Sequence, residues 1–296
     1  MPRNRVFTPR RALLTTAVLA ALGGAPHAWG QAQLSALNGA NGFKINGNSE
    51  NDQSGRAVSG LGDVNGDGRD DLLIGAPFAS SGGSQSGSSY VVFGSTALVA
   101  GGVSSLAVLN GANGFQLSGV ASGDNSGWAV SGLEDVNGDG LDDLIIGAPF
   151  ASANGIYSGA SYVVFGKSNL GASGSFFLGG LDGVRGFQIN GALSLDQAGR
   201  AVSGLGDVNG DGVADLLIGA PAASPNGSQS GASYVVFGGT ALGAGGVLQL
   251  SALNGANGFK ISGVAASDRS GIAVSGLGDV NGDGRADLLV AGTGTS

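Results

Sequence analysis

The chain has 296 residues, a formal net charge of −8, no cysteine and one histidine. The missing cysteines exclude disulfides, thiolate metal sites and cysteine nucleophiles, and the acidic balance makes a nucleic-acid or anionic-membrane binder a poor expectation. The histidine, His27, lies in a predicted leader, so the rest of the chain also lacks the serine–histidine pair of many hydrolases. We therefore expect no enzymatic activity.

Residues 1–30 are predicted to be a signal peptide. Four arginines precede an apolar stretch over 12–25, and the small residues Ala28 and Gly30 suit a signal peptidase, which would start the mature chain near Gln31. The pair Arg10–Arg11 leaves twin-arginine export open beside the general route. No other stretch has the eighteen or more apolar residues of a membrane helix. We expect a protein that is secreted or at the cell surface, periplasmic or extracellular.

A 72-residue repeat fills the remainder of the chain. The predicted units are 34–105, 106–177, 178–249 and an incomplete 250–296. Each opens with an apolar run that ends in Gly-Phe, as at Phe43, and continues into a turn of the pattern Asp-x-x-Gly, as at Asp52. A fixed period of this length indicates that one structural unit has been copied.

The units are predicted to be all-β. No segment carries apolar residues at helical spacing, whereas each complete unit holds short β-prone runs between glycine, asparagine, aspartate or proline, such as 57–61, 72–74 and 90–93. Runs such as 144–146 are apolar without alternation, which indicates strands covered on both faces. Four-stranded blades packed around an axis provide that environment, so we predict a β-propeller of about 3.7 units, partial or open. A β-helix would need a shorter period.

Each unit contains Asp-Val-Asn-Gly-Asp-Gly, within the longer pattern Asp-x-Asn-x-Asp-Gly-x-x-Asp. This pattern offers side-chain oxygens at positions 1, 3, 5 and 9 and a backbone carbonyl at position 7, a donor set that suits Ca²⁺. We predict up to four calcium ions. The candidate ligands are Asp63, Asn65, Asp67, Arg69 and Asp71; Asp135, Asn137, Asp139, Leu141 and Asp143; Asp207, Asn209, Asp211, Val213 and Asp215; and Asp279, Asn281, Asp283, Arg285 and Asp287.

Three other interpretations of this loop fit less well. An EF-hand would place Glu at position 12, where isoleucine or valine stands here, so the loop joins strands and not helices. Magnesium demands a more rigid octahedral geometry and keeps more water. A bare hairpin turn needs only the central residues and does not explain aspartate at positions 1 and 9 in all four copies.

The repeats resemble the FG-GAP family. The Gly-Phe opening, the nine-residue loop and the Gly-Ala-Pro at 75–77, 147–149 and 219–221 are similar to the blades of integrin α-subunit propellers and of many bacterial surface proteins. The resemblance covers residues 34–292. It implies a β-propeller with calcium in the hairpin loop between the first two strands of a blade, on the face away from the usual ligand-binding side.

The fourth unit departs from the family pattern. It stops near Gly292, before any Gly-Ala-Pro or Tyr-Val-Val-Phe strand, whereas integrin-type propellers resemble seven-blade rings. The chain is therefore a fragment of a longer array, an open arc, or a subunit that closes with another copy. An unpaired blade edge is an aggregation liability, which favours the first two, and it is also an expected place of association.

Two functions of different classes are expected. The first is an adhesion-like binding module whose protein or glycan partner docks on the loops 78–89, 150–161 and 222–233, which differ between units while their frames do not. The second is a calcium-braced structural array that spaces other domains of a longer protein.

Two features that recur at the same position of the repeats are assigned a structural role. The aspartate of Asp-x-x-Gly is expected to hold its own turn through backbone amides, and the Gly-Phe and Tyr-Val-Val-Phe aromatics are expected to be blade core. Trp128 stands where Arg56 and Arg200 stand in the neighbouring units. If it were exposed, it would offer a face to a sugar ring.

Overall fold

The computed structural model describes residues 16–19, 34–39, 42–95 and 103–294. Most of the predicted leader lies outside these residues. Within them the regular structure is β-strand and short 3₁₀ turn, and no helix is long and apolar enough to cross a membrane. The elements are β1 (Thr16–Leu19), η1 (Leu34–Ala36), β2 (Phe43–Asn46), β3 (Ala57–Gly62), β4 (Asp71–Ala76), β5 (Ser88–Val92), β6 (Val103–Ser105), η2 (Leu106–Val108), β7 (Gly114–Ser118), β8 (Ala129–Glu134), β9 (Asp143–Ala148), β10 (Ala160–Val164), β11 (Ser175–Phe177), η3 (Leu178–Gly180), β12 (Gly186–Asn190), β13 (Ala201–Gly206), β14 (Asp215–Ala220), β15 (Ala232–Val236), β16 (Val247–Gln249), η4 (Leu250–Ala252), β17 (Gly258–Ser262), β18 (Ala273–Gly278) and β19 (Asp287–Ala291).

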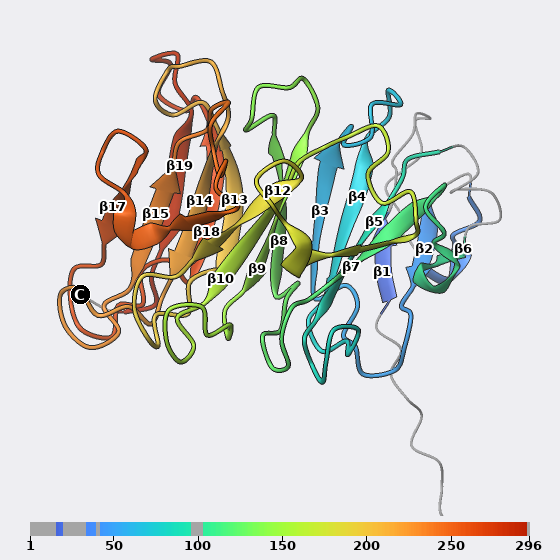
Figure 1. Ribbon diagram of the computed structural model, residues 1–296, viewed down its shortest axis with the longest axis horizontal. Helices are drawn as coiled ribbons and strands as arrows, with labels where there is room; N and C mark the ends of the chain where they lie inside the picture. The colour runs from blue at the N-terminus through green and yellow to red at the C-terminus, as the bar shows by residue number, and fades with distance from the viewer. Residues whose placement is uncertain (1–15, 20–33, 40–41, 96–102, 295–296) are drawn as a thin grey trace, which may run out of the picture.

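The strands form a row of sheets that follow one another along the chain (Figure 1). The orders are β3-β4-β5-β7-β11, β8-β9-β10-β12-β16 and β13-β14-β15-β17, with the smaller sheets β1-β2-β6 and β18-β19 beside them. The first strands of successive sheets, β3, β8, β13 and β18, lie next to one another, as the inner strands of propeller blades do. The all-β prediction of propeller-type blades is confirmed.

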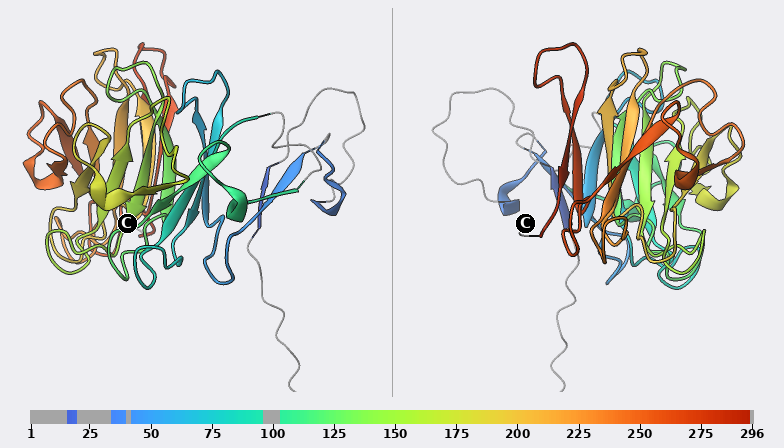
Figure 2. Two further views of the ribbon diagram at one scale, coloured as in Figure 1. Left: turned by 45° about the vertical axis from the view of Figure 1, so that its right-hand side comes forward. Right: turned by 90° about the vertical axis from the view of Figure 1, so that its left-hand side faces the viewer.

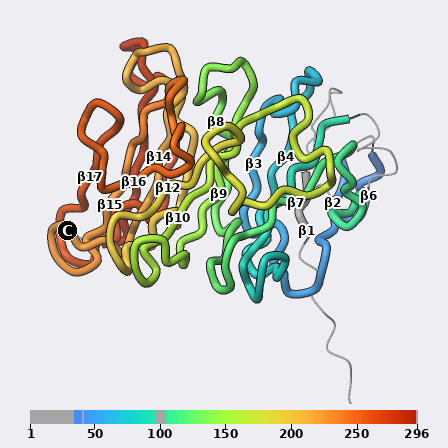
Figure 3. Tube along the Cα trace, viewed as in Figure 1, coloured from blue at the N-terminus to red at the C-terminus, as the bar shows by residue number. Residues whose placement is uncertain are grey.

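Each of the three larger sheets draws strands from two neighbouring repeats. The Gly-Phe strand β7, which opens the second unit, pairs antiparallel with β5 of the first. The next connection reaches back as well, because β11 follows β10 of the second sheet in sequence yet pairs in parallel with β7 of the first. Figure 3 shows this connection crossing between the sheets in yellow-green, and Figure 2 gives two further views of the row. Neighbouring repeats are therefore joined by backbone pairing within a sheet as well as by packing between sheets.

The core lies between facing sheets. Leu144, Ile145 and Ile146 of β9 are each 0% exposed, and they belong alternately to two hydrophobic clusters, one on each side of the sheet. The prediction that such runs are covered on both faces is confirmed. The blade tyrosines Tyr90 and Tyr162 are also buried, as expected for core positions.

The glycine of each Gly-Ala-Pro has a packing reason. A Cβ at this position would run into a backbone carbonyl oxygen in the turn before the inner strand of the next sheet, so only glycine permits the observed approach. The three pairs are Gly75 with the Gly127 carbonyl, Gly147 with the Gly199 carbonyl, and Gly219 with the Gly271 carbonyl.

The described residues form an open arc and not a closed ring. At one end the hairpin β18-β19 is a sheet of two strands; at the other, β2 pairs with β1 and β6. The backbone of β1 meets β2 in the register that β5 keeps with β7, with Leu19 opposite Phe43 as Val91 is opposite Phe115. Because β1 lies in the predicted leader, this pairing involves a segment that signal cleavage would remove. The predicted partial or open propeller is confirmed.

Candidate functional site

The four aspartate-rich loops are hairpin connections between the first two strands of a blade. They join β3 to β4, β8 to β9, β13 to β14 and β18 to β19, and they lie together along the upper edge of the molecule in Figure 1. The loops 78–89, 150–161 and 222–233 follow the second strands and lie along the opposite edge. Strand direction therefore separates the candidate metal face from the variable-loop face.

Backbone amides fix the carboxylate at position 1 of each loop. In the first loop Asp63 Oδ1 accepts hydrogen bonds from the amides of Gly66 at 2.7 Å and Asp67 at 3.0 Å, and Asp63 Oδ2 accepts from Gly68 at 2.7 Å. The Asn65 Oδ1 atom accepts from the Asp67 amide at 2.9 Å. The amides of positions 4, 5 and 6 bond the first aspartate in the same way in the other three loops. The loop shape is thus set by the protein itself.

The aspartate at position 9 is an anchor beneath the loop. Asp143 is 0% exposed; its Oδ2 accepts from the Val136 amide at 3.0 Å and its Oδ1 from the Gly166 amide at 2.8 Å. Asp71 makes the equivalent bonds in the first blade. Burial raises the pKa of Asp143 to about 8 and that of Asp71 to about 6, and backbone hydrogen bonds offset part of this effect.

The oxygen-only donor set of these loops fits a hard cation such as Ca²⁺ in its chemistry. In the described part of the chain, however, no group of three or more His, Cys, Asp or Glu side chains is arranged to hold a metal ion. The calcium ligands proposed from the sequence therefore stay a prediction.

Neighbouring loops are connected to one another. The Asp142 amide donates to the Asp63 carbonyl at 3.4 Å, and the Asp63 amide donates to Asp142 Oδ2 at 2.7 Å. The amide of Ala214 bonds the carbonyl of Asp135 in the same way at 3.3 Å. Position 8 of one loop thus contacts position 1 of the preceding loop, so an ordered loop also orders the boundary between two blades.

On the opposite face, each variable loop is bonded to the turn before the next inner strand. The Asn125 amide donates to the Gln85 carbonyl at 3.2 Å, and the Gln197 amide donates to the Tyr157 carbonyl at 3.1 Å. These four residues all have positive φ, between 49° and 55°. Left-handed backbone at non-glycine residues is costly and persists where surrounding contacts determine it, as they do here.

The repeated Asp-x-x-Gly aspartates hold their own turns. The Oδ2 atoms of Asp124, Asp196 and Asp268 accept from the backbone amides of the residues three positions earlier, at 3.0, 3.1 and 2.7 Å. Burial raises the pKa of Asp124 and of Asp196 above the usual aspartate value. Their predicted turn-forming role is confirmed.

The indole of Trp128 is not open for a sugar to stack on it. The side chain is half-buried, and the guanidinium carbons of Arg56 and Arg200 lie 3.7 and 4.2 Å from the indole centroid. Phe78 and Phe150 contact its edge region, with centroid separations of 6.3 and 5.2 Å. The condition set by the sequence, an exposed tryptophan face, is therefore not met, because the equivalent residues of both neighbouring blades converge on the indole around the axis.

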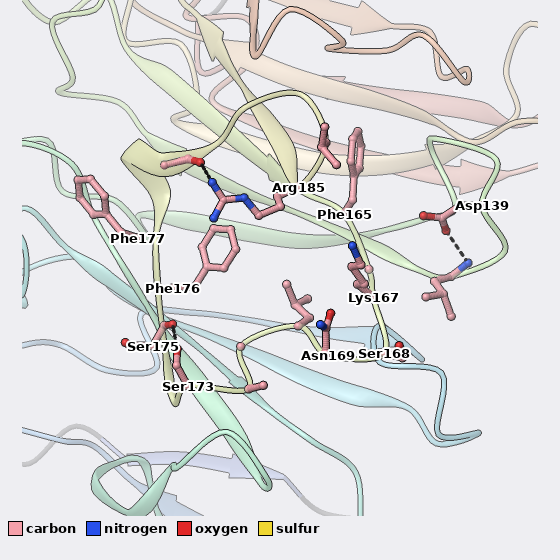
Figure 4. A pocket seen from close by; sticks show the side chains of 17 residues that line it. Asp139, Phe165, Lys167, Ser168, Asn169, Ser173, Ser175, Phe176, Phe177 and Arg185 are labelled. Atoms are coloured by element: carbon pink, nitrogen blue, oxygen red, sulfur yellow. Dashed lines mark hydrogen bonds between the residues drawn. The ribbon is translucent and has the colours of Figure 1, made fainter.

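A cavity of about 650 Å³ lies beside the second aspartate-rich loop (Figure 4). The connection after β10 supplies most of its lining, including Lys167, and Asp139 of the loop contributes to its rim. Arg185 donates to the Gly180 carbonyl and pairs with Asp182 at 3.3 Å. Apolar rings such as Phe176 make up much of the remaining wall, and we identify no nucleophile–base pair in it.

Comparison with known proteins agrees with this architecture. The FG-GAP repeat family matches residues 54–92, 126–164 and 198–236, each of which runs from the turn before an inner strand to the end of the third strand. The matched part of each unit therefore contains the aspartate-rich loop and the Gly-Ala-Pro.

Several integrin α subunits are similar over part of the chain. Integrin alpha-PS2 of Drosophila melanogaster is 36% identical over 133 residues, which is 44% of this chain and 9% of that protein. Integrin alpha pat-2 of Caenorhabditis elegans is 33% identical over 169 residues, 53% of this chain and 12% of that protein. A protein named phosphatidylinositol-glycan-specific phospholipase D, from Dictyostelium discoideum, is 34% identical over 182 residues, 59% of this chain and 19% of its own length.

The chain thus spans less than a fifth of each of these relatives. The repeats and the integrin similarity point to a recognition domain and not to an enzyme, although one relative has a phospholipase name. With three matched repeats in a row of propeller blades, the chain is an FG-GAP repeat protein that resembles integrin α subunits.

Proposed function

We propose that the chain is an exported, calcium-binding and non-catalytic recognition module of the cell surface or extracellular space. Its partner, a protein or a glycan, would dock on the loops 78–89, 150–161 and 222–233. The observation that carries the proposal is the separation of two faces: four near-identical aspartate-rich loops on one edge, and loops of differing sequence on the other. A rigid frame that carries variable loops is typical of binding proteins.

Calcium would stabilise the frame from the first of these faces. In each loop the side chains at positions 1, 3, 5 and 9 and the carbonyl at position 7 would hold one ion, which neutralises carboxylates that otherwise repel one another. At a tenfold excess over its dissociation constant, each ion would add about 1.4 kcal/mol of folding stability, and four would add roughly 5 to 6 kcal/mol. Because adjacent loops are hydrogen-bonded to one another, part of this stabilisation would act on the blade boundaries.

Calorimetric titration with calcium tests this part of the proposal. Asp139→Asn keeps an acceptor for the Leu141 amide but removes one charge from the second loop, so we expect one calcium fewer per chain or one much weaker site. Asp70→Asn removes the same charge from position 8 of the first loop, which is no candidate ligand, and should leave the stoichiometry unchanged. No heat of calcium binding in the unmodified protein, together with an unchanged melting temperature in excess chelator, would rule out the calcium brace.

Loop replacement tests the recognition surface. Binding of the protein to cells, matrix or glycan arrays in calcium is measured before and after the exposed part of one variable loop, 152–157, is replaced by a glycine/serine segment of equal length, which leaves Ala151 and Ala160 of the core in place. Loss of binding with an unchanged melting temperature supports the assignment, and full retention after all three loops are replaced contradicts it.

A structural array is the second candidate. The backbone pairing of β11 with β7 and of β16 with β12 ties successive blades together, as a rigid spacer requires. This alternative predicts a calcium-dependent melting temperature without binding in any of the assays above.

A further inference from the structure

A cationic cavity of about 260 Å³ opens on the variable-loop face, between the third sheet and the turn before β18. Its polar lining consists of Gln197, Arg200, Gln229 and Arg269, and its apolar lining of proline, alanine and isoleucine. No aspartate or glutamate lines it. Two guanidinium groups therefore share a cavity that supplies them with no counter-charge.

The charge of Arg200 is only partly compensated. Its guanidinium stacks on Trp128, on which Arg56 is also stacked, and its Nη1 atom is buried and has no hydrogen-bond acceptor in the described part of the chain. Neither of the ion pairs found among these residues includes Arg200. Burial, and then the nearby charge of Arg56, lowers the pKa of Arg200. Stacking on an aromatic ring offsets this cost in part, and an anion would offset it further.

Arg269 is held in place for the same cavity. Its Nε and Nη2 atoms donate to Gln229 Oε1 at 3.1 and 2.9 Å, and its backbone amide donates to the Gln229 carbonyl at 3.0 Å. The Gln229 side chain keeps its amide N–H groups as donors, and the side chain of Gln197 makes no hydrogen bond within the residues described. The cavity thus combines two fixed cations with two carboxamides that can donate and accept.

We propose that this cavity binds an acidic sugar, with the carboxylate between Arg200 and Arg269 and the hydroxyls on the carboxamides of Gln197 and Gln229. Guanidinium groups pair with carboxylates through parallel, charge-assisted hydrogen bonds. A carboxylate alone would leave both carboxamides and most of the volume unused, whereas a sugar ring uses them. This site rests on the recognition function proposed above, and it adds a ligand class, acidic sugars, for one end of the variable-loop face.

Calorimetric titration of the full chain in calcium, with D-glucuronate as the probe, tests the proposal. We expect measurable binding that weakens at least tenfold in Arg200→Gln and in Arg269→Gln, and that is unchanged in Lys44→Gln, which removes the same charge from β2. Arg269 is exposed, so its variant keeps the test valid if Arg200→Gln fails to fold.

Two neutral or simpler probes complete the test. Glucose should bind at least tenfold more weakly than glucuronate, and so should succinate, which carries carboxylates without hydroxyls. Absence of glucuronate binding, equal binding of glucose or succinate, or unchanged affinity in both arginine variants would overturn the proposal. Such a result would leave the calcium titration and the loop-replacement assay to decide the proposed function separately.

Discussion

Alanine substitutions at three glycines should reveal how closely the blades approach. A Cβ at Gly147 would run into the Gly199 carbonyl oxygen of the next sheet, and a Cβ at Gly132 would lie 2.7 Å from the Gly60 carbonyl oxygen. At Gly60 itself a Cβ would have no atom within 4 Å, and its φ lies outside the left-handed region, so Gly60→Ala is the matched control.

The expected losses follow from these geometries. A Cβ at Gly147 would be carried by the backbone of β9, and the group that it meets is the backbone carbonyl of Gly199. Neither group can turn away as a flexible side chain would. Overpacking of this kind costs about 1–3 kcal/mol or more, and we expect Gly147→Ala at the top of that range and Gly132→Ala near its lower end. Gly60→Ala should stay within about 0.5 kcal/mol of the unmodified protein, because it also lowers the entropy of the unfolded chain.

Urea unfolding in excess calcium measures the series, and thermal melting provides a second readout. For a domain of this size each kcal/mol corresponds to roughly 2–4 °C in melting temperature. Equal stabilities for Gly147→Ala and Gly60→Ala would refute the explanation of the Gly-Ala-Pro glycine as a contact position between blades.

Two further predictions concern Asp143 and the backbone angle at Glu134 and its equivalent Gly206. Burial raises the pKa of Asp143, so in excess chelator its contribution to the free energy of unfolding is complete below the usual aspartate pKa and is lost as pH rises through about 8. Urea unfolding should therefore show stability that falls between pH 5 and 9, and Asp143→Asn should flatten this dependence. An unchanged slope in the variant would contradict the assignment of the pH dependence to Asp143. Glu134 has φ 58°, and its equivalent in the third blade, Gly206, has φ 70°. Glu134→Gly should therefore raise the free energy of unfolding by up to about 1 kcal/mol, and Gly206→Glu should lower it by a similar amount. Equal stability of the two variants would show that the backbone angle is not the cause.

Much of the local structure could be predicted from the sequence. The 72-residue period, the hairpin position of the aspartate-rich loops and the burial of strands such as β9 all follow from residues that are close in the chain. The turn role of Asp124 belongs here too, since its hydrogen-bond partner is three residues away. The calcium ligands remain a prediction of the same local kind.

Contacts across blades could not be predicted in this way. The pairing of β11 with β7 joins segments almost sixty residues apart, and no composition signal in the short strand Ser175–Phe177 marks it. Phe259 gives another example: it is 39% exposed, although its equivalents Phe115 and Phe187 are fully buried. The connection around Gly171, which follows β10 of the second sheet, covers Phe115 of the first sheet, and no described residue covers Phe259 in that way.

The sequence by itself determined which positions are equivalent, because a repeated unit repeats its turns, loops and strand faces. Only the tertiary structure decided which equivalent positions meet. Arg56, Trp128 and Arg200 are each separated by one repeat in sequence, yet the packing of inner strands around an axis brings all three into one stack. The same packing places Arg200 beside Arg269 and so forms the cationic cavity. Periodicity fixes local conformation, whereas the rotation from one blade to the next sets distances between repeats, and that rotation arises only when the sheets pack.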